Sequence, residues 1–148
     1  MNERVLGEYL ISTDKARLDI DLIHDFLANR SYWAKGIPME TVRKSVEHCL
    51  TVGVYHQHQQ IGFARVITDY TTFAYLADVF IVEGYRQKGL SKQLMQFIMD
   101  QDFVKEIRRF VLATKDAHSL YASFGFEPLN QPELFMQIHH LNKYTSQP

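Results

Sequence analysis

Apolar residues recur at two periods along the chain, and together they predict strands and helices in one continuous order. Helical spacing of apolar residues runs through four segments, Asp19–Arg30, Met39–Leu50, 90–102 and 116–123. Strand patterns run through 6–12, 51–56, 61–68, 73–82, 107–113 and 134–140, with a short strand near Phe126. Hairpins combined with a right-handed βαβ crossover predict an α/β (mixed α+β) fold. Its sheet should be mixed and mostly antiparallel, with helices on both faces.

Length and composition place the chain among ordinary globular proteins. Its 148 residues fit one domain, 1–148, with a polar tail at 143–148. A formal charge of −1 argues against a nucleic-acid partner, because affinity for phosphate backbones needs clustered Lys and Arg. No apolar run reaches membrane-spanning length, nothing at the start resembles a signal peptide, and the single Cys49 cannot form an internal disulfide. We therefore expect a cytoplasmic protein with no membrane partner.

The turn between strand 73–82 and helix 90–102 carries the most informative motif. It reads Arg86-Gln87-Lys88-Gly89-Leu90-Ser91. A strand, a tight turn and a helix in this order aim backbone N–H groups and the positive end of a helix dipole at one point. This arrangement suits a phosphate or pyrophosphate. A P-loop is excluded because the Gly-Lys-Ser/Thr ending is absent, and a Rossmann site would need glycines that this turn lacks.

With this motif the element order resembles the GCN5-related N-acetyltransferase (GNAT) superfamily, whose turn reads Gln/Arg-x-x-Gly-x-Gly/Ala. The chain departs from that pattern only at Ser91. A second segment, Ala117–Glu127, is similar to the family's Ala-x-x-Leu-Tyr-x-x-x-Gly-Phe. The resemblance implies an acetyl-CoA-dependent N-acetyltransferase that acts by direct attack in a ternary complex. The alternative is a catalytically silent acyl-CoA-binding module.

The resemblance also implies which residues hold acetyl-CoA. The backbone of Phe80, Ile81 and Val82 would pair with the pantetheine arm, and Thr114 stands where many relatives carry a pantetheine-contacting asparagine. The pyrophosphate would lie against the turn and the start of the helix, at Arg86, Gln87, Lys88, Gly89, Leu90, Ser91 and Lys92. For Lys88 and Lys92 the alternative is an ordinary surface lysine, and Arg86 is expected to brace the turn.

Two side chains are candidates for proton transfer. By resemblance Tyr121 donates a proton to the departing thiolate, a role that a neutral phenol can fill; the alternative is an aromatic packing residue. Asp78 is the first candidate for the general base, because an aspartate in so apolar a strand would be costly to bury unpaired. Its alternative is a structural carboxylate bonded to a neighbouring loop.

The acceptor would be a small-molecule amine or a peptide amino terminus. By resemblance it would meet the loop 31–38, where Tyr32 and Trp33 could stack on it; the alternative for Trp33 is a loop anchor. No metal site is expected, because the histidine pairs 56/58 and 139/140 lack converging carboxylates or thiols and should be solvated. Homodimers are frequent in the family, and the edge of strand 134–140 is a reasonable place for one.

Overall fold

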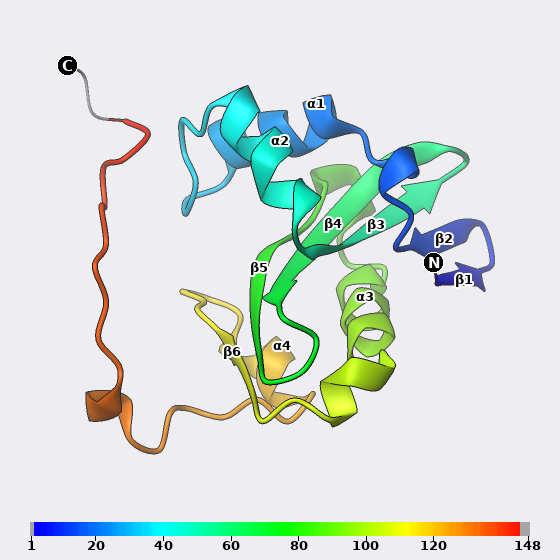
Figure 1. Ribbon diagram of the computed structural model, residues 1–148. Coiled ribbons are helices and arrows are strands. Elements are labelled where there is room, and N and C mark those ends of the chain that lie inside the picture. Colours follow the sequence, from blue (N-terminus) through cyan, green and yellow to red (C-terminus); the bar gives the residue numbers. More distant parts are fainter. Residues whose placement is uncertain (1, 146–148) are drawn as a thin grey trace.

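A six-stranded sheet forms the centre of the computed structural model, which describes residues 2–145. The strands follow chain order across the sheet (Figure 1): β1 (Glu3–Leu6), β2 (Tyr9–Ser12), β3 (Leu50–His56), β4 (Gln59–Thr68), β5 (Phe73–Ile81) and β6 (Arg109–Leu112). Neighbouring strands are antiparallel except for the parallel pair β5 and β6. The prediction of a mixed, mostly antiparallel sheet is confirmed.

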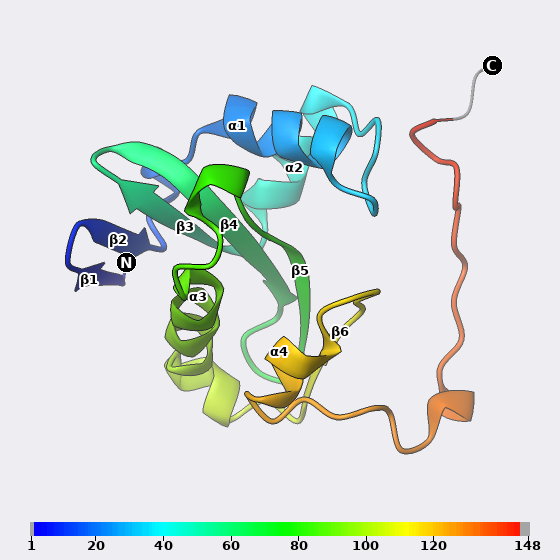
Figure 2. The ribbon, with the colours of Figure 1, turned by 180° about the vertical axis from the view of Figure 1, so that it is seen from behind.

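Helices cover both faces of this sheet, as the sequence predicts (Figure 2). One face carries α1 (Ile20–Asp25), which continues into a π-helical turn at Phe26–Arg30, and α2 (Met39–Glu47). The other face carries α3 (Leu90–Met99) and α4 (His118–Ala122). Single 3-10 turns lie at Lys15–Arg17, Glu83–Tyr85, Asp102–Lys105 and Pro132–Leu134. None of the helices in residues 2–145 is both long and apolar enough to cross a bilayer.

The two layers bury separate clusters against the sheet. On the α1–α2 side, the ring of Phe26 stacks on Phe80 of β5, with 3.9 Å between the ring centroids. On the opposite side, the apolar stripe of α3, including Leu94 and Ile98, packs against β3 to β5. Because successive side chains of a strand point to opposite faces, β4 and β5 supply both clusters and are buried on both sides.

The structure corrects the sequence-based strands at both ends of the chain. The single strand expected at 6–12 is a hairpin, β1 and β2, which turns at Gly7 with φ of +60°. No strand forms near Phe126 or at 134–140 within the described residues. Residues 127–145 instead leave the body as an extended arm that runs along one side of the molecule (Figure 1). The predicted polar tail, 143–148, lies in this arm up to residue 145, and residues 146–148 are outside the described part.

Candidate active site

A bulge in β5 opens the sheet where the candidate site lies. Phe63 of β4 pairs with Phe80, but Arg65 pairs with Ala77, so β5 carries one extra residue between them. That residue is Asp78, whose φ of +55° is left-handed and uncommon for a non-glycine. β5 pairs with β6 only through Phe73–Leu76, before the bulge. Beyond it the two strands diverge. Phe80 and Ile81 still pair with β4 on one side, but on the side away from β4 no strand among residues 2–145 lies beside them.

Backbone direction after the bulge suits an added strand. The Val82 N–H donates to the Ile61 carbonyl of β4 at 2.9 Å. Because peptide groups alternate in direction along a strand, the N–H and C=O of Ile81 point the other way, into the gap toward β6. Arg86 reaches the Ile81 carbonyl from that side, where its Nε donates at 2.9 Å. The side chain of Arg86 therefore braces the turn onto β5, which is the role expected for it.

The turn after β5 has the geometry of an anion site. Gly89 is the N-cap of α3 with φ of +78°, and a Cβ built on it would meet nothing within 4 Å. No side chain caps this helix end, so the first N–H groups of α3 have no acceptor from a capping side chain. Gln87 is also left-handed, with φ of +63°. Lys88 and Lys92 are exposed beside the turn and leave the approach to the backbone open.

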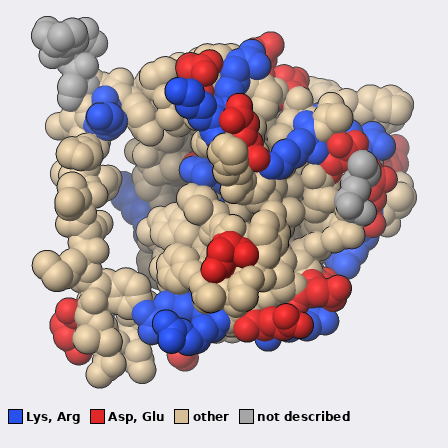
Figure 3. Space-filling view, viewed as in Figure 1, with Lys and Arg blue, Asp and Glu red and all other residues tan. Residues whose placement is uncertain are grey.

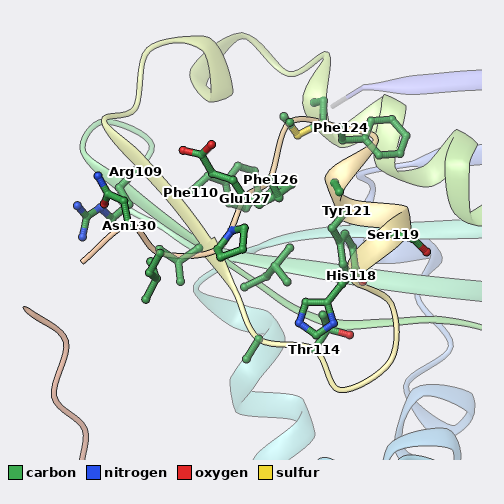
Figure 4. Close-up of a pocket in the computed structure, with 18 of the residues that line it drawn as sticks. Arg109, Phe110, Thr114, His118, Ser119, Tyr121, Phe124, Phe126, Glu127 and Asn130 are labelled. Carbon is green, nitrogen blue, oxygen red and sulfur yellow. The ribbon is translucent and has the colours of Figure 1, made fainter. Parts of the chain in front are cut away.

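The side chain of Tyr121 lines a groove between β6, α4 and the start of the arm. The cavity measures about 900 Å³, and Figure 4 shows Tyr121, His118 and Thr114 grouped at one end. Tyr121 is 8% exposed, and no group among residues 2–145 hydrogen-bonds to its hydroxyl. Burial, reinforced by the nearby Tyr32 and Asp116, raises the pKa of Tyr121 to about 12. The phenol is therefore protonated at neutral pH and free to donate.

Thr114 and Tyr32 shape the loop that leads from β6 to α4. The Thr114 hydroxyl accepts the Ala117 N–H at 3.1 Å and so holds the turn directly before α4, the short helix that carries Tyr121. The Tyr32 hydroxyl accepts the Lys115 N–H at 2.9 Å, and the Lys115 ammonium lies 5.6 Å from the Tyr32 ring centroid. The loop after α1 is thus tied to the loop after β6. Tyr32, far from Tyr121 in sequence, is thereby close enough to act on the Tyr121 phenol electrostatically.

Asp78 and Trp33, predicted separately, are in direct contact. Asp78 Oδ1 accepts from Trp33 Nε1 at 2.7 Å, and its Oδ2 accepts from Arg65 Nε at 2.6 Å. The Asp78 side chain is 8% exposed, so this is a nearly buried ion pair extended by an indole N–H. Such contacts match the alternative stated for Asp78, a structural carboxylate that holds a neighbouring loop. They also match the anchoring alternative for Trp33.

The indole of Trp33 nevertheless remains accessible. It is 42% exposed, and it meets the Tyr32 ring edge-on with centroids 5.0 Å apart. Asp78 therefore fixes one edge of the indole and leaves the rest of the ring uncovered. A pair of aromatic rings held at right angles beside the bulge can serve a flat or cationic acceptor group.

Sequence reasoning missed two contributors to the site. Arg65 lies in β4 without any motif, and only the register of β4 against β5 brings it to Asp78. His56 was expected in solvent, but that prediction is wrong: its Nδ1 lies 2.9 Å from the Tyr85 hydroxyl and its ring packs on Tyr9. The contact supports the turn that begins at Glu83. No local signal in the sequence distinguishes His56 from the solvated histidines.

Comparisons with known proteins agree with this geometry. A family model described as an acetyltransferase (GNAT) domain matches residues 47–128, a span that includes the Gly89 turn and Tyr121. A crystal structure from Xanthomonas campestris pv. campestris, described as a "putative acetyltransferase belonging to the gnat family", is 42% identical. It superposes with a TM-score of 0.92 over 96% of this chain and 100% of that chain. The chain belongs to the GNAT acetyltransferase family.

More distant relatives share the family name or the fold. A "putative acetyltransferase" of Gibberella zeae is 27% identical over 135 residues, covering 78% of this chain and 76% of that protein. A structure from Deinococcus radiodurans R1 is 18% identical, with a TM-score of 0.73 over 100% of this chain and 99% of that one, and shows the common fold. GNAT acetyltransferases use acetyl-CoA, and the open turn at Gly89 and the free β5 edge fit that substrate. Among residues 2–145, no group of three His, Cys, Asp or Glu side chains is arranged to hold a metal ion.

Proposed function

We propose that this GNAT acetyltransferase is an N-acetyltransferase that moves the acetyl group of acetyl-CoA to a primary amine. The amine belongs to a small molecule or to a peptide amino terminus, and it attacks directly in a ternary complex. One observation carries the proposal: β5 parts from β6 after Leu76 and leads directly to the helix end at Gly89, which no side chain caps, while the groove beside β6 is lined by Tyr121.

The donor site follows from backbone geometry. The pyrophosphate lies against the N–H groups of residues 87–91, where Gly89 permits close approach and the dipole of α3 favours an anion. Lys88 and Lys92 add positive charge from the rim. The pantetheine arm takes the place of the missing strand beside residues 80–82, within reach of the Ile81 N–H and of Thr114. A backbone N–H at this point can also stabilise the thioester oxygen as negative charge grows on it.

The reaction balances with one proton acceptor for the amine and one donor for the leaving group. The neutral amine nitrogen attacks the thioester carbonyl carbon, forming the C–N bond. The tetrahedral intermediate then collapses and the C–S bond breaks. Tyr121 donates toward the departing sulfur, and the product nitrogen loses its extra proton to solvent. The products are an amide and free CoA thiol.

Asp78 remains the candidate that could accept the amine proton, but its contacts favour a positioning role. Both of its oxygens already accept hydrogen bonds, one of them from the cationic Arg65. An acceptor amine would have to displace one of these two donors before it could reach a carboxylate oxygen of Asp78. In the proposed mechanism Asp78 therefore fixes the Trp33 indole, and Trp33 and Tyr32 form the acceptor wall.

The donor site can be tested by a matched pair of glycine substitutions. Gly89→Glu places a carboxylate where the phosphate should lie and should lower acetyl-CoA affinity at least a hundredfold by calorimetry. Gly7→Glu is the control, because Gly7 has a similar positive φ of +60° and open surroundings but lies in the β1–β2 hairpin. Equal loss in both variants would indicate backbone strain alone, and unchanged affinity of Gly89→Glu would exclude the turn as the donor site.

Catalysis can be separated from binding by a screen of amines. Acetyl-CoA is incubated with the protein and each amine, and release of free thiol is followed. Amine-dependent thiol release, with the acetylated amine identified by mass spectrometry, supports an N-acetyltransferase. Tight acetyl-CoA binding without turnover on small amines, amino acids or peptide amino termini would favour the acyl-CoA-binding module instead.

A further inference from the structure

A second cavity lies between the acceptor wall and the far end of the arm. It measures about 500 Å³ and shares no lining residue with the groove that carries Tyr121. Tyr32 and Trp33 line it, together with Lys35 from the same loop. Residues 139–145, at the far end of the arm, supply the rest of the lining. The cavity therefore brings a second segment of the chain to the two aromatic rings.

A close backbone contact holds the far end of the arm against this loop. A Cβ built on Gly36 would lie only 2.8 Å from the Tyr144 carbonyl oxygen, so the two backbones approach closely only because this residue is a glycine. Closer to the start of the arm, the space-filling view shows an opening between the arm and the body (Figure 3). At its far end the arm is thus near enough to the loop for both segments to contact one ligand.

The cavity has a basic lining. Four of its side chains carry a positive charge or can donate a hydrogen bond from a ring nitrogen: Lys35, Lys143, His139 and His140. Among residues 2–145, no Asp or Glu lines it. Figure 3 agrees, since the upper end of the arm shows a basic residue and no acidic one. Asp78 lies at one edge of the Trp33 indole, but Arg65 offsets its charge. Such a lining favours an anionic group.

Tyr32 connects this basic cavity to the proposed site of acyl transfer. Its hydroxyl accepts the Lys115 N–H at 2.9 Å, in the loop directly before α4. Burial raises the pKa of Tyr121, and Tyr32 and Asp116 add to that rise, so both lie near the phenol. A substrate that lies along Tyr32 therefore has an acidic neighbour at its Tyr121 end and basic neighbours at its other end. An acceptor with matching charges carries an amine at one end and an acidic group at the other.

From this geometry we propose that the cavity is an anion subsite, and that the acceptor is an amine that also bears a carboxylate or a phosphate. The inference rests on the proposed N-acetyltransferase function and names the class of its acceptor. The acidic group lies between Lys35 and Lys143, the body of the acceptor lies on the aromatic pair, and the amine reaches the thioester near Tyr121. Exposed ion pairs add little affinity alone, so the two lysines act mainly by orienting an acceptor that the rings already hold.

Matched pairs of amines, with and without the acidic group, test the subsite on the full chain. Phenylalanine with phenethylamine and histidine with histamine test a carboxylate, and O-phosphoethanolamine with ethanolamine tests a phosphate. Release of free thiol from acetyl-CoA should favour the acidic member of at least one pair by about tenfold in kcat/KM, and added salt should reduce this preference. Equal rates, or a faster neutral member, in every pair would refute the subsite and leave the N-acetyltransferase function standing.

Substitution of the two lysines provides the comparison within the protein. The double variant Lys35→Gln, Lys143→Gln should raise the KM of the acidic amine by about tenfold and so remove the preference, with acetyl-CoA affinity unchanged. Lys44→Gln is the matched control, because Lys44 is an exposed lysine on α2 that does not line the cavity. The control should keep the preference. A preference that survives in the double variant would refute the assignment of these lysines to an anion subsite.

The fluorescence of Trp33 separates a failure of the subsite from a failure of the proposed function. Trp33 is the only tryptophan in the sequence and is 42% exposed, so a ligand in the cavity should change its emission without any turnover. In the presence of CoA, the acidic member of the preferred pair should change the emission at a lower concentration than the neutral member. Such a preference in binding without any acetylated product would contradict the N-acetyltransferase function and support the subsite. Equal binding of both members would overturn the subsite.

Discussion

Removal of one oxygen atom, by Tyr121→Phe, tests the proposed chemistry most directly. The ring packs edge-on against Phe126, with centroids 6.1 Å apart, and phenylalanine keeps that contact. The hydroxyl has no hydrogen-bond partner among residues 2–145, so its loss breaks no structural bond. Stability and acetyl-CoA affinity should therefore stay close to wild type, and the effect should appear in kcat.

The size of that effect follows from the acidity of the phenol. Burial raises the pKa of Tyr121 to about 12, whereas an ordinary thiol has a pKa of about 8.5. Complete transfer of the phenolic proton to a thiolate is then uphill by about 5 kcal/mol, at about 1.4 kcal/mol per unit of pKa. A hydrogen bond from the neutral phenol to the sulfur as it becomes charged is the more favourable contribution, worth about 1.5–3 kcal/mol. This corresponds to a loss of about 10- to 150-fold in kcat.

The assay is the initial rate of free thiol release with the best amine from the screen, combined with calorimetry for acetyl-CoA. Tyr55→Phe serves as the control, because Tyr55 is another buried tyrosine whose hydroxyl has no partner but lies outside the groove. A loss in kcat of less than about threefold for Tyr121→Phe would refute any role for the hydroxyl. A loss above about a thousandfold would refute the hydrogen-bond reasoning and indicate complete proton transfer.

Three further substitutions test the supporting structure. Asp78→Asn leaves Arg65 without its charge partner and should lower the free energy of unfolding by about 3 kcal/mol in denaturant titrations. If the substitution instead changed the pH dependence of kcat and left stability unchanged, Asp78 would be the base. Trp33→Phe removes the N–H that donates a hydrogen bond to Asp78, and it should raise the KM for the acceptor about tenfold with acetyl-CoA affinity unchanged. An equal loss of acetyl-CoA affinity would contradict the role of Trp33 in the acceptor wall. Tyr55→Phe removes a buried hydroxyl that has no partner and should not reduce the unfolding free energy at neutral pH. Burial raises the pKa of Tyr55 in the folded protein, so wild-type stability should be complete below pH 10 and fall as pH rises above it, where unfolded tyrosines ionise. Tyr55→Phe should lose less over that range, and an unchanged alkaline slope would contradict the assigned burial cost.

The sequence by itself determined the features that depend on local chemistry and periodicity. The periodicity of apolar residues predicted the order of helices and strands from α1 to α4, and Asp19, the first residue of the predicted helix 19–30, caps α1 by accepting the Leu22 N–H. The sequence predicted the turn at Gly89 because a glycine between an apolar strand and an amphipathic helix is a local pattern, and the structure gives that glycine a left-handed φ. The sequence indicated Tyr121 as a candidate site residue because its neighbours in the chain match a family pattern.

Only the tertiary structure decided the features that depend on contacts between distant residues. The bulge at Asp78 arises from the register of β4 against β5, and it brings Arg65 and Trp33 to one carboxylate. No periodicity encodes such a register, because pairing between strands is set by the packing of both faces at once. The segment 134–140 shows the same limit, since its alternation predicts a strand but does not specify which segment supplies the neighbour. A strand needs hydrogen-bond partners on another segment, and within residues 2–145 no segment supplies them to 134–140.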